Sequence, residues 1–172
     1  MFRTFIIQDM KINEGVEWAV HCCLNLSWVA PDRTVTAAKL AAFYNLPTAY
    51  LNKQLQALGR AGIVSSISGP RGGFQLARRP EKITLMDVIA AIEGPEQAFR
   101  CTAIRQRGPA GDLDAADGYR KPCAVSQAMR TAEFVWRKEL ASRTVADIKA
   151  AVERSTPQAP ARVRRWFDNS RT

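Results

Sequence analysis

The chain lacks the long apolar runs and the leader that would place it in or across a membrane. No run of residues approaches the ~18 consecutive apolar positions of a membrane span. The first nine residues, MFRTFIIQD, are too short for a secretory signal and lack a small-residue cleavage site. We therefore expect a cytoplasmic protein with no membrane partner. Residues 1–9 read as a loose N-terminal arm or as a mis-assigned start before Met10.

The chain also lacks the signatures of an enzyme. It contains no G-x-S-x-G and no glycine-rich phosphate loop, and its one histidine, His21, is not paired with a catalytic nucleophile. We predict that the protein is not an enzyme.

Acidic residues are in the minority. The 25 lysines and arginines outnumber 16 aspartates and glutamates, which gives a net charge of +9. Such an excess favours a polyanionic partner, because neutralising phosphates releases counterions. Hydrophobic residues (47%) and charged residues (24%) are in the ordinary globular range. With 172 residues, the chain is one domain or one domain with an appendage.

Two short helices joined by a tight turn are predicted between Thr36 and Ala61. The first, TAAKLAAFY, repeats apolar residues at the spacing of one helix face, and Asn45-Leu46-Pro47 ends it. The second begins at Thr48 and keeps leucines on one stripe, which leaves a polar face outward. This arrangement is typical of a helix-turn-helix.

A hairpin with a basic tip is predicted directly after these helices. The alternating segments IVSSI and GFQL flank Gly-Pro-Arg-Gly-Gly, so the pattern indicates a wing. A helix-turn-helix followed by a wing reads double-stranded DNA. We expect side chains of the second helix to contact bases and phosphates, and the wing arginine to enter the minor groove. The predicted contacts are Thr48, Tyr50, Asn52, Lys53, Gln56 and Arg71.

The remaining helices have local start signals. Asn13 is a predicted N-cap for a helix from Glu14 to Trp28, whose inner face includes Cys23 but not Cys22. Thr84-x-x-Asp87 and Thr144-x-x-Asp147 are predicted capping boxes of two further helices. Between the two boxes, residues 96–123 include a long polar loop of the kind that is usually functional or disordered.

The predicted fold class is mainly α with a small β-hairpin: a winged helix-turn-helix DNA-binding domain plus a long dimerisation helix. Apolar residues from Ala124 to Leu140 form a stripe that is wide for a helix beside a small domain. In a DNA-binding protein this favours a homodimer, since two-fold proteins match two half-sites. Packing of this helix on its own domain is the alternative. The predicted organisation is 10–95 winged domain, 96–123 sensor loop, 124–155 dimerisation helix with a short following helix, and 156–172 basic tail, with ordered structure ending at Pro157 and Pro160.

The four cysteines fall into two pairs. Cys22 and Cys23 read as small apolar residues of the first helix. Cys101 and Cys123 bracket the polar loop, where thiolates suit a metal or redox site. Residues 102–122 separate them, however, and that spacing matches no compact ligand motif.

Several segments resemble the IscR/NsrR family of dimeric bacterial winged-helix regulators, from Met10 to about Glu153. They are EWAVHCC, AYLNKQLQALGRAGIV, SGPRGGFQLARRP and ITLMDVIAAIEG. Many members carry an iron–sulfur cluster in the loop before the dimer helix, and its state controls DNA binding. Typical members supply three loop cysteines, whereas this chain has two. It is more similar to the RsrR redox-sensing branch, around FRCTAIRQRGP and PCAVSQAM.

The resemblance implies a ligand set. In the RsrR branch a [2Fe–2S] cluster is held across the dimer by two loop cysteines of one subunit and a glutamate and a histidine of the other. The matching residues are Cys101, Cys123 and Glu17, and the histidine position falls on Tyr44. His21 is a further candidate, because an i, i+4 pair with Glu17 shares one helix face. Ordinary core or surface roles remain the alternative for both His21 and Tyr44.

The predicted function is that of a dimeric bacterial transcriptional regulator whose DNA binding is controlled by a redox-sensitive [2Fe–2S] cluster. The alternative keeps the fold without a cluster, and sensing then uses a Cys101/Cys123 thiol switch or a small-molecule ligand. A non-sensing architectural DNA binder is a third possibility, which would show little sequence preference.

Overall fold

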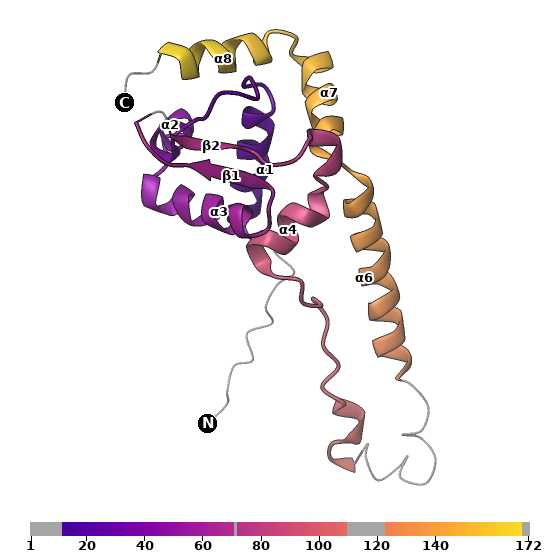
Figure 1. The fold of residues 1–172 in the computed structure, drawn as a ribbon. Helices are drawn as coiled ribbons and strands as arrows, with labels where there is room; N and C mark the ends of the chain where they lie inside the picture. The colour runs from indigo at the N-terminus through magenta and orange to yellow at the C-terminus, as the bar shows by residue number, and fades with distance from the viewer. Residues whose placement is uncertain (1–11, 71, 110–122, 170–172) are drawn as a thin grey trace. The chain divides into compact units, whose positions relative to one another are not determined.

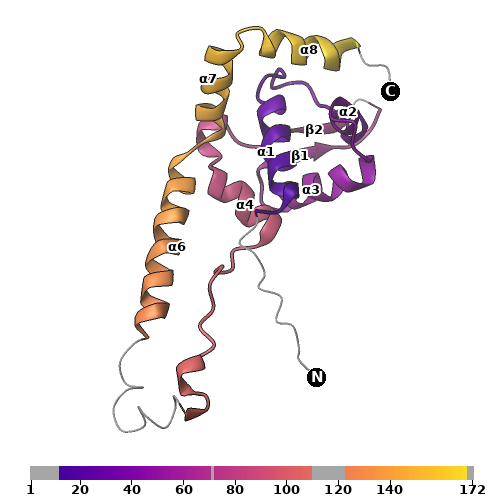
Figure 2. The same cartoon turned by 180° about the vertical axis from the view of Figure 1, so that it is seen from behind.

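The structure is a computed structural model that describes residues 12–70, 72–109 and 123–169. The chain divides into two units, one formed by residues 1–95 and 140–172 and the other by residues 96–139 (Figures 1 and 2). The predicted N-terminal arm, residues 1–9, lies outside the described residues. No helix in the described part of the chain is long and apolar enough to span a membrane.

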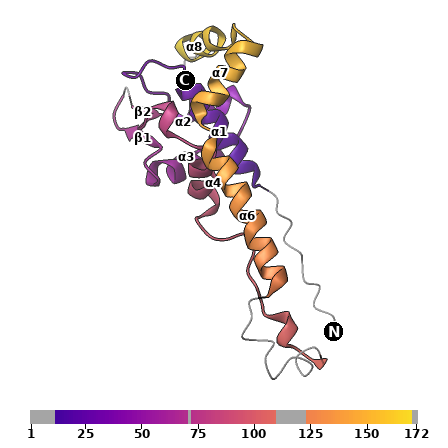
Figure 3. The same ribbon diagram turned by 90° about the vertical axis from the view of Figure 1, so that its right-hand side faces the viewer.

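Helix α1 (Glu14–Leu26) is the central element of the first unit. Its predicted cap is confirmed, because the Asn13 side chain accepts a hydrogen bond of 2.8 Å from the Gly15 amide. Helices α3, α4 and α7 and strand β2 all contact α1 (Figures 1 and 3). Because neighbours cover several sides of α1, Cys22 and Cys23 are both fully buried. The prediction that only Cys23 faces inward is therefore wrong.

The helix-turn-helix consists of α2 (Ala37–Phe43) and α3 (Thr48–Arg60). Thr36 caps α2 by accepting from the Lys39 amide at 3.2 Å. Between the helices, Asn45 has a left-handed φ of 53°, a conformation that asparagine tolerates better than most residues. Leu51, Leu55 and Leu58 of α3 are fully buried, as the leucine stripe predicts.

The wing is the antiparallel hairpin of β1 (Val64–Ile67) and β2 (Gly73–Leu76), with Val64 opposite Leu76. Val35 adds a bridge to Phe74, with amide-to-carbonyl distances of 2.9 and 2.7 Å. This bridge brings backbone close to Gly73, where a Cβ atom would lie 2.7 Å from the Val35 carbonyl. Glycine is required there, since any side chain would push the wing off the domain.

Two helices of the first unit begin at adjacent caps. A 3₁₀ turn, η1 (Pro80–Lys82), precedes α4 (Leu85–Glu93), and α7 spans Val145–Ser155. Both predicted capping boxes are confirmed, at Thr84 and at Thr144. These two threonines form a β-bridge in which the Leu85 amide donates to the Arg143 carbonyl at 2.8 Å.

The C-terminal segment is a helix, α8 (Ala159–Asn169), and not a disordered basic tail. The prediction that ordered structure ends at Pro157 and Pro160 is wrong. Pro160 lies in the first turn of α8, where the missing amide hydrogen would have no helical partner. Val163 and Phe167 are buried, and the Phe167 ring lies 5.4 Å from the ring of Phe43 at the end of α2.

The second unit contains a short 3₁₀ turn, η2 (Ile104–Gln106), and most of the long helix α6 (Ala124–Ser142). None of the residues of α6 is buried. Several large apolar side chains are exposed on it, namely Val125, Met129, Phe134 and Val135. The unit therefore has an apolar helix surface that its described residues leave exposed.

Candidate nucleic-acid interface and cysteine site

Helix α3 presents a polar face opposite its buried leucines. Asn52, Lys53 and Gln56 are exposed, as is Thr48 at the start of the helix, whereas Tyr50 is half-buried. These exposures agree with a DNA-reading face, and the contacts themselves stay a prediction. Arg60 is exposed four residues after Gln56 and shares this face, although the sequence analysis missed it. Its i, i+4 spacing from Gln56 is the signal that would have found it.

The wing tip is a tight turn. The Gly72 amide donates to the Gly69 carbonyl at 2.8 Å, and a Cβ atom on Gly72 would lie 2.2 Å from the Ile67 carbonyl. Glycine is thus needed to close the tip. The predicted minor-groove contact, Arg71, lies outside the described residues.

Glu17 and His21 lie one turn apart on α1, and their surroundings differ. Glu17 is exposed, whereas His21 is half-buried beside aromatic rings. The His21 ring centroid lies 6.5 Å from that of Trp18 and 5.6 Å from that of Tyr44. Glu17 is therefore open to a ligand, and His21 has its ring packed in an aromatic cluster.

Tyr44 is a poor metal ligand in this setting. Its hydroxyl accepts a hydrogen bond of 2.7 Å from the Asn25 side chain. Burial, reinforced by the nearby Cys22 thiol, raises the pKa of Tyr44 well above its usual range. Partial burial disfavours the phenolate form that iron binds, and the hydroxyl already accepts from Asn25, so the surroundings argue against Tyr44 as the fourth ligand.

Cys101 and Cys123 are brought together in the second unit. Cys123 precedes α6 and its carbonyl accepts from the Gln127 amide at 2.9 Å, so it occupies the N-cap position. Both side chains line one cavity, and the Cys101 side chain is among the causes that lower the pKa of Cys123. Cys101 is exposed and Cys123 half-buried, so both are accessible.

The start of α6 favours the thiolate form of Cys123. Hydrogen bonding from the Ser126 amide is the main cause that lowers the pKa of Cys123. Partial desolvation opposes the shift, while the Val125 amide, the positive charge of Arg105 and the Cys101 thiol add to it. A helix N-terminus and a neighbouring cation are the usual surroundings of a reactive or metal-binding cysteine.

A polar clamp holds the segment before Cys101 against α6. The Glu133 carboxylate accepts from the Ala98 amide at 3.0 Å and pairs with Arg137 at 2.8 Å. Partial desolvation works against ionisation of Glu133, but these hydrogen bonds and the Arg137 charge outweigh it and lower its pKa. Arg137 also donates to the Glu96 carbonyl. The clamp fixes the direction in which the chain runs toward Cys101.

An apolar cavity of about 440 Å³ lies beside the two sulfurs. Its lining includes Phe99, Ile104 and Val125 together with both cysteines and Arg105. Apolar surroundings limit the access of water to a metal or a disulfide held there.

The donor set within one chain is incomplete for a four-ligand cluster. The described residues contain no group of three or more histidine, cysteine, aspartate or glutamate side chains placed to hold one metal ion. The cysteine pair alone fits the two thiolate positions of one iron. Among the residues that the structure describes, no third donor of the same chain is grouped with these two cysteines, so a ligand from another protomer is a candidate for completing the set.

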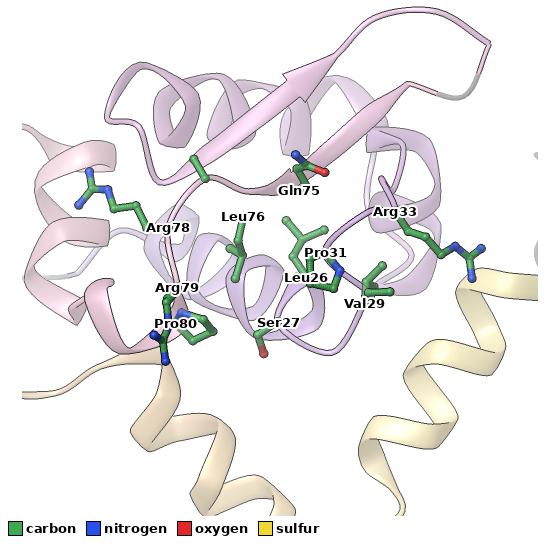
Figure 4. A pocket seen from close by; sticks show the side chains of 12 residues that line it. Leu26, Ser27, Val29, Pro31, Arg33, Gln75, Leu76, Arg78, Arg79 and Pro80 are labelled. Atoms are coloured by element: carbon green, nitrogen blue, oxygen red, sulfur yellow. The ribbon is translucent and has the colours of Figure 1, made fainter.

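A second cavity, of about 320 Å³, lies between the end of α1, strand β2 and the connector to η1 (Figure 4). Leu26, Val29 and Leu76 contribute apolar surface to it. The three arginines in its lining have partners already: Arg33 pairs with Asp168, Arg78 donates to the Gly62 carbonyl at 2.9 Å, and Arg79 pairs with Glu81 at 3.4 Å. Because each of these arginines already has a partner, none of them is free to bind an anionic ligand in the cavity.

Comparison with known proteins identifies the family. Residues 12–151 match the model of the Rrf2 family, described as an iron-dependent transcriptional regulator. The chain belongs to the Rrf2 family of transcriptional regulators. Family membership bears out the resemblance to IscR-type regulators and the prediction that the chain is not an enzyme, and it supports DNA as a partner.

Individual Rrf2 relatives are similar over different lengths. BadM of Rhodopseudomonas palustris is 36% identical over 84 residues, 49% of this chain and 53% of BadM, so that match spans about half of the relative. YffB of Lactococcus lactis is 28% identical over 139 residues, 81% of this chain and 86% of YffB.

Solved structures of Rrf2 regulators share the fold, which confirms the predicted winged-helix class. CymR of B. subtilis superposes with a TM-score of 0.62 at 23% identity, over 83% of this chain and 98% of CymR. T. potens IscR gives a TM-score of 0.63 at 20% identity, over 86% of this chain and 92% of IscR.

Proposed function

We propose that this Rrf2 regulator is a homodimer that senses redox state through the Cys101–Cys123 pair and transmits it to DNA. The observation that carries the proposal is that Cys101 and Cys123 line one cavity at the N-terminus of α6, although the 21 residues 102–122 separate them in the sequence. A cysteine pair with a lowered Cys123 pKa has no evident packing role, because neither side chain is buried. Its chemistry is that of a sensor.

In the leading form of the proposal the pair holds a [2Fe–2S] cluster. Cys101 and Cys123 would supply two thiolates, and the lowered pKa of Cys123 favours the form that binds iron. The cluster, when bound, supplies a one-electron couple. The family description as iron-dependent supports this form. Glu17 of another protomer is the first candidate for a further ligand and His21 the second, since Glu17 is exposed and His21 packs against rings.

A second candidate function uses the pair without iron. It is favoured by the lack of a three-donor group among the described residues and by the surroundings of Tyr44, whose burial disfavours the phenolate form. The Cys123 thiolate would attack hydrogen peroxide, forming a sulfenic acid as the O–O bond breaks, and the hydroxide that leaves would become water after protonation. The Cys101 thiolate would then displace the sulfenic oxygen, which also leaves as water, and close a disulfide.

One preparation separates the two candidates. We expect anaerobically purified protein to contain iron and sulfide and to be coloured when the cluster is oxidised, and the colour to fade when dithionite reduces the cluster by one electron. Colourless protein without iron, in which both Cys101 and Cys123 react with iodoacetamide, would reject the cluster. A mass loss of two hydrogens after peroxide treatment would then identify the disulfide form, and no change with peroxide would reject both forms.

The DNA-reading face is tested by two substitutions on α3. Lys53→Ala should weaken binding to all sequences and lower the slope of log affinity against log salt by about 0.9, as the loss of one phosphate contact does. Gln56→Ala should reduce discrimination at one base position by roughly 1–3 kcal/mol. If both variants bound a selected operator like the parent, the proposed face would be wrong.

The homodimer is supported by the uncovered apolar surface of α6. Val125 is 66% exposed, Phe134 67% and Val135 60%, values that are costly for large apolar side chains on a free surface. Replacing Met129 and Val135 together with glutamate should place unpaired charge in the interface and yield monomers in light scattering. A dimer of parental size would show that Met129 and Val135 do not lie in the interface.

A further inference from the structure

Helix α8 lies beyond residues 12–151, the part of the chain that the family model matches. We propose that α8 is an accessory DNA-binding helix that contacts backbone phosphates beside the helix-turn-helix. This inference rests on the proposed role of α2 and α3 in DNA reading.

One side of α8 anchors it to the first helix of the helix-turn-helix. Val163 and Phe167 are 6% and 4% exposed, and the rings of Trp166 and Phe167 lie 5.0 and 5.4 Å from that of Phe43. The Lys39 ammonium of α2 donates to the Phe167 carbonyl at 3.3 Å. These contacts hold α8 at a fixed position on α2.

The other side of α8 is cationic and open. Arg162, Arg165 and Asn169 are exposed at positions i, i+3 and i+7, which share one helix face. With Trp166 they surround an open hollow of about 480 Å³. Neither arginine forms an ion pair with any residue that the structure describes, whereas Asp168, the acid of α8, is paired with Arg33. Guanidinium and amide donors in this arrangement suit phosphate oxygens.

The position of α8 also suits DNA. Phe43 is the last residue of α2, only a short turn before α3 begins at Thr48. In helix-turn-helix proteins the first helix crosses the DNA backbone. In Figures 1 and 2 the C-terminal end of α8 lies toward the same side of the first unit as the hairpin tip and the first turn of α3. The C-terminal end of α8 therefore lies beside the elements that would meet the duplex.

An anionic membrane is the other large phosphate surface that a basic helix with tryptophan and phenylalanine can bind. Such helices insert their apolar face into lipid. The apolar face of α8 is already buried against Phe43, so insertion would require α8 to leave the domain. The contacts thus favour DNA.

The test compares two charge-matched double variants of the full chain. Arg162→Gln/Arg165→Gln removes the cationic face, and Lys82→Gln/Arg154→Gln removes the same charge from exposed residues of η1 and α7. Affinity is measured against salt with a duplex selected from a randomised library by the parent protein. We expect the α8 variant to lower the slope of log affinity against log salt concentration by about 0.9 for each lost phosphate contact, or about 1.8 for each bound chain. The control variant should leave this slope unchanged.

Each outcome decides the proposal. Arg162→Lys/Arg165→Lys should restore most of the slope, because lysine keeps the charge, and unchanged thermal melting would show that the glutamine variant is folded. Equal slopes for the α8 variant and the control would overturn the inference. So would binding of the parent to phosphatidylserine vesicles that is lost in the α8 variant while DNA binding persists. A parent that selects no duplex would reject DNA reading itself, whereas loss of binding in Lys53→Ala with an unaffected α8 variant rejects only the role of α8.

Discussion

Cys22 and Cys23 lie inside α1, whereas Cys101 and Cys123 meet at the exposed start of α6, and these surroundings give the same thiol opposite chemistry. Burial raises the pKa of Cys22 to about 12 and also raises that of Cys23. At the second site, a helix amide is the main cause that lowers the pKa of Cys123. The buried pair is held as neutral thiols, and the exposed pair is prepared for the thiolate.

The comparison teaches that residue type and number say little about a redox site. Two adjacent cysteines in the sequence, Cys22 and Cys23, form the inert pair. Two cysteines separated by residues 102–122 form the accessible pair. What differs is access to water and the presence of amide dipoles and cations, so each of the following predictions changes one of these factors or removes one sulfur.

The largest expected difference between the pairs is in iron content. In anaerobic preparations Cys101→Ala and Cys123→Ala should lose essentially all iron and sulfide, because a thiolate ligand is removed in each case. Cys22→Ala should keep the parental content, since its thiol stays protonated in the core. Iron that persists in Cys123→Ala would show that the exposed cysteine pair does not hold the cluster.

The second difference is in alkylation of the iron-free native protein. At pH 8, Cys123 should react with iodoacetamide on the order of a thousandfold faster than Cys22, because each pKa unit changes the thiolate fraction about tenfold. Burial of Cys22 and Cys23 adds to the gap. Peptide mapping by mass spectrometry gives the four rates, and comparable rates at Cys22 and Cys123 would contradict the assigned surroundings.

The third difference concerns stability in alkali. The folded pKa of Cys22 is raised, so its contribution is fully present below the unfolded pKa and is lost as pH rises toward about 12. Above about pH 9 the unfolded thiol ionises first, and the free energy of unfolding should fall by about 1.4 kcal/mol per pH unit for this thiol. Cys22→Ala should flatten the decline by that amount in urea titrations. Parallel declines in parent and variant would show that Cys22 ionises equally in both states.

The smallest effect is expected from Arg105, whose charge helps to lower the pKa of Cys123. Arg105→Gln should raise that pKa and slow alkylation of Cys123 by roughly two- to threefold, since an exposed charge acts through a high dielectric and is screened by salt. Arg107→Gln, in the same segment, is the matched control. A larger effect from Arg107→Gln would show that the charge that lowers the pKa of Cys123 is not that of Arg105.

The sequence predicted the parts of the fold that depend on neighbouring residues. The caps at Asn13, Thr84 and Thr144 and the hairpin were predictable because a cap or a tight turn needs only a few residues around it. The recognition face of α3 was partly predictable. Helical periodicity places Lys53 on the face opposite the leucines, but the prediction left out Arg60, which is exposed on the same face.

The parts that depend on tertiary contacts were not predictable in this way. Cys22 is buried because several elements surround α1, which the pattern of one helix does not reveal. Helix α8 was missed because two prolines outweighed the i, i+4 pair Val163 and Phe167. The contact of Cys101 with Cys123 followed from the family resemblance, since their spacing alone matches no ligand motif.

The bridge between Thr84 and Thr144 has a consequence for how this protein can change through evolution. The chain leaves the first unit after Pro95 and returns by Leu140, and shortly after its return Val145 donates to the Ile83 carbonyl at 2.9 Å. Two backbone hydrogen bonds, from Leu85 to Arg143 and from Val145 to Ile83, thus join the two parts of the first unit at the points where the chain leaves it and returns. Residues 96–139 can therefore change in length and in ligands during evolution. An insertion or deletion there leaves the bridge between Thr84 and Thr144, at the starts of α4 and α7, unchanged.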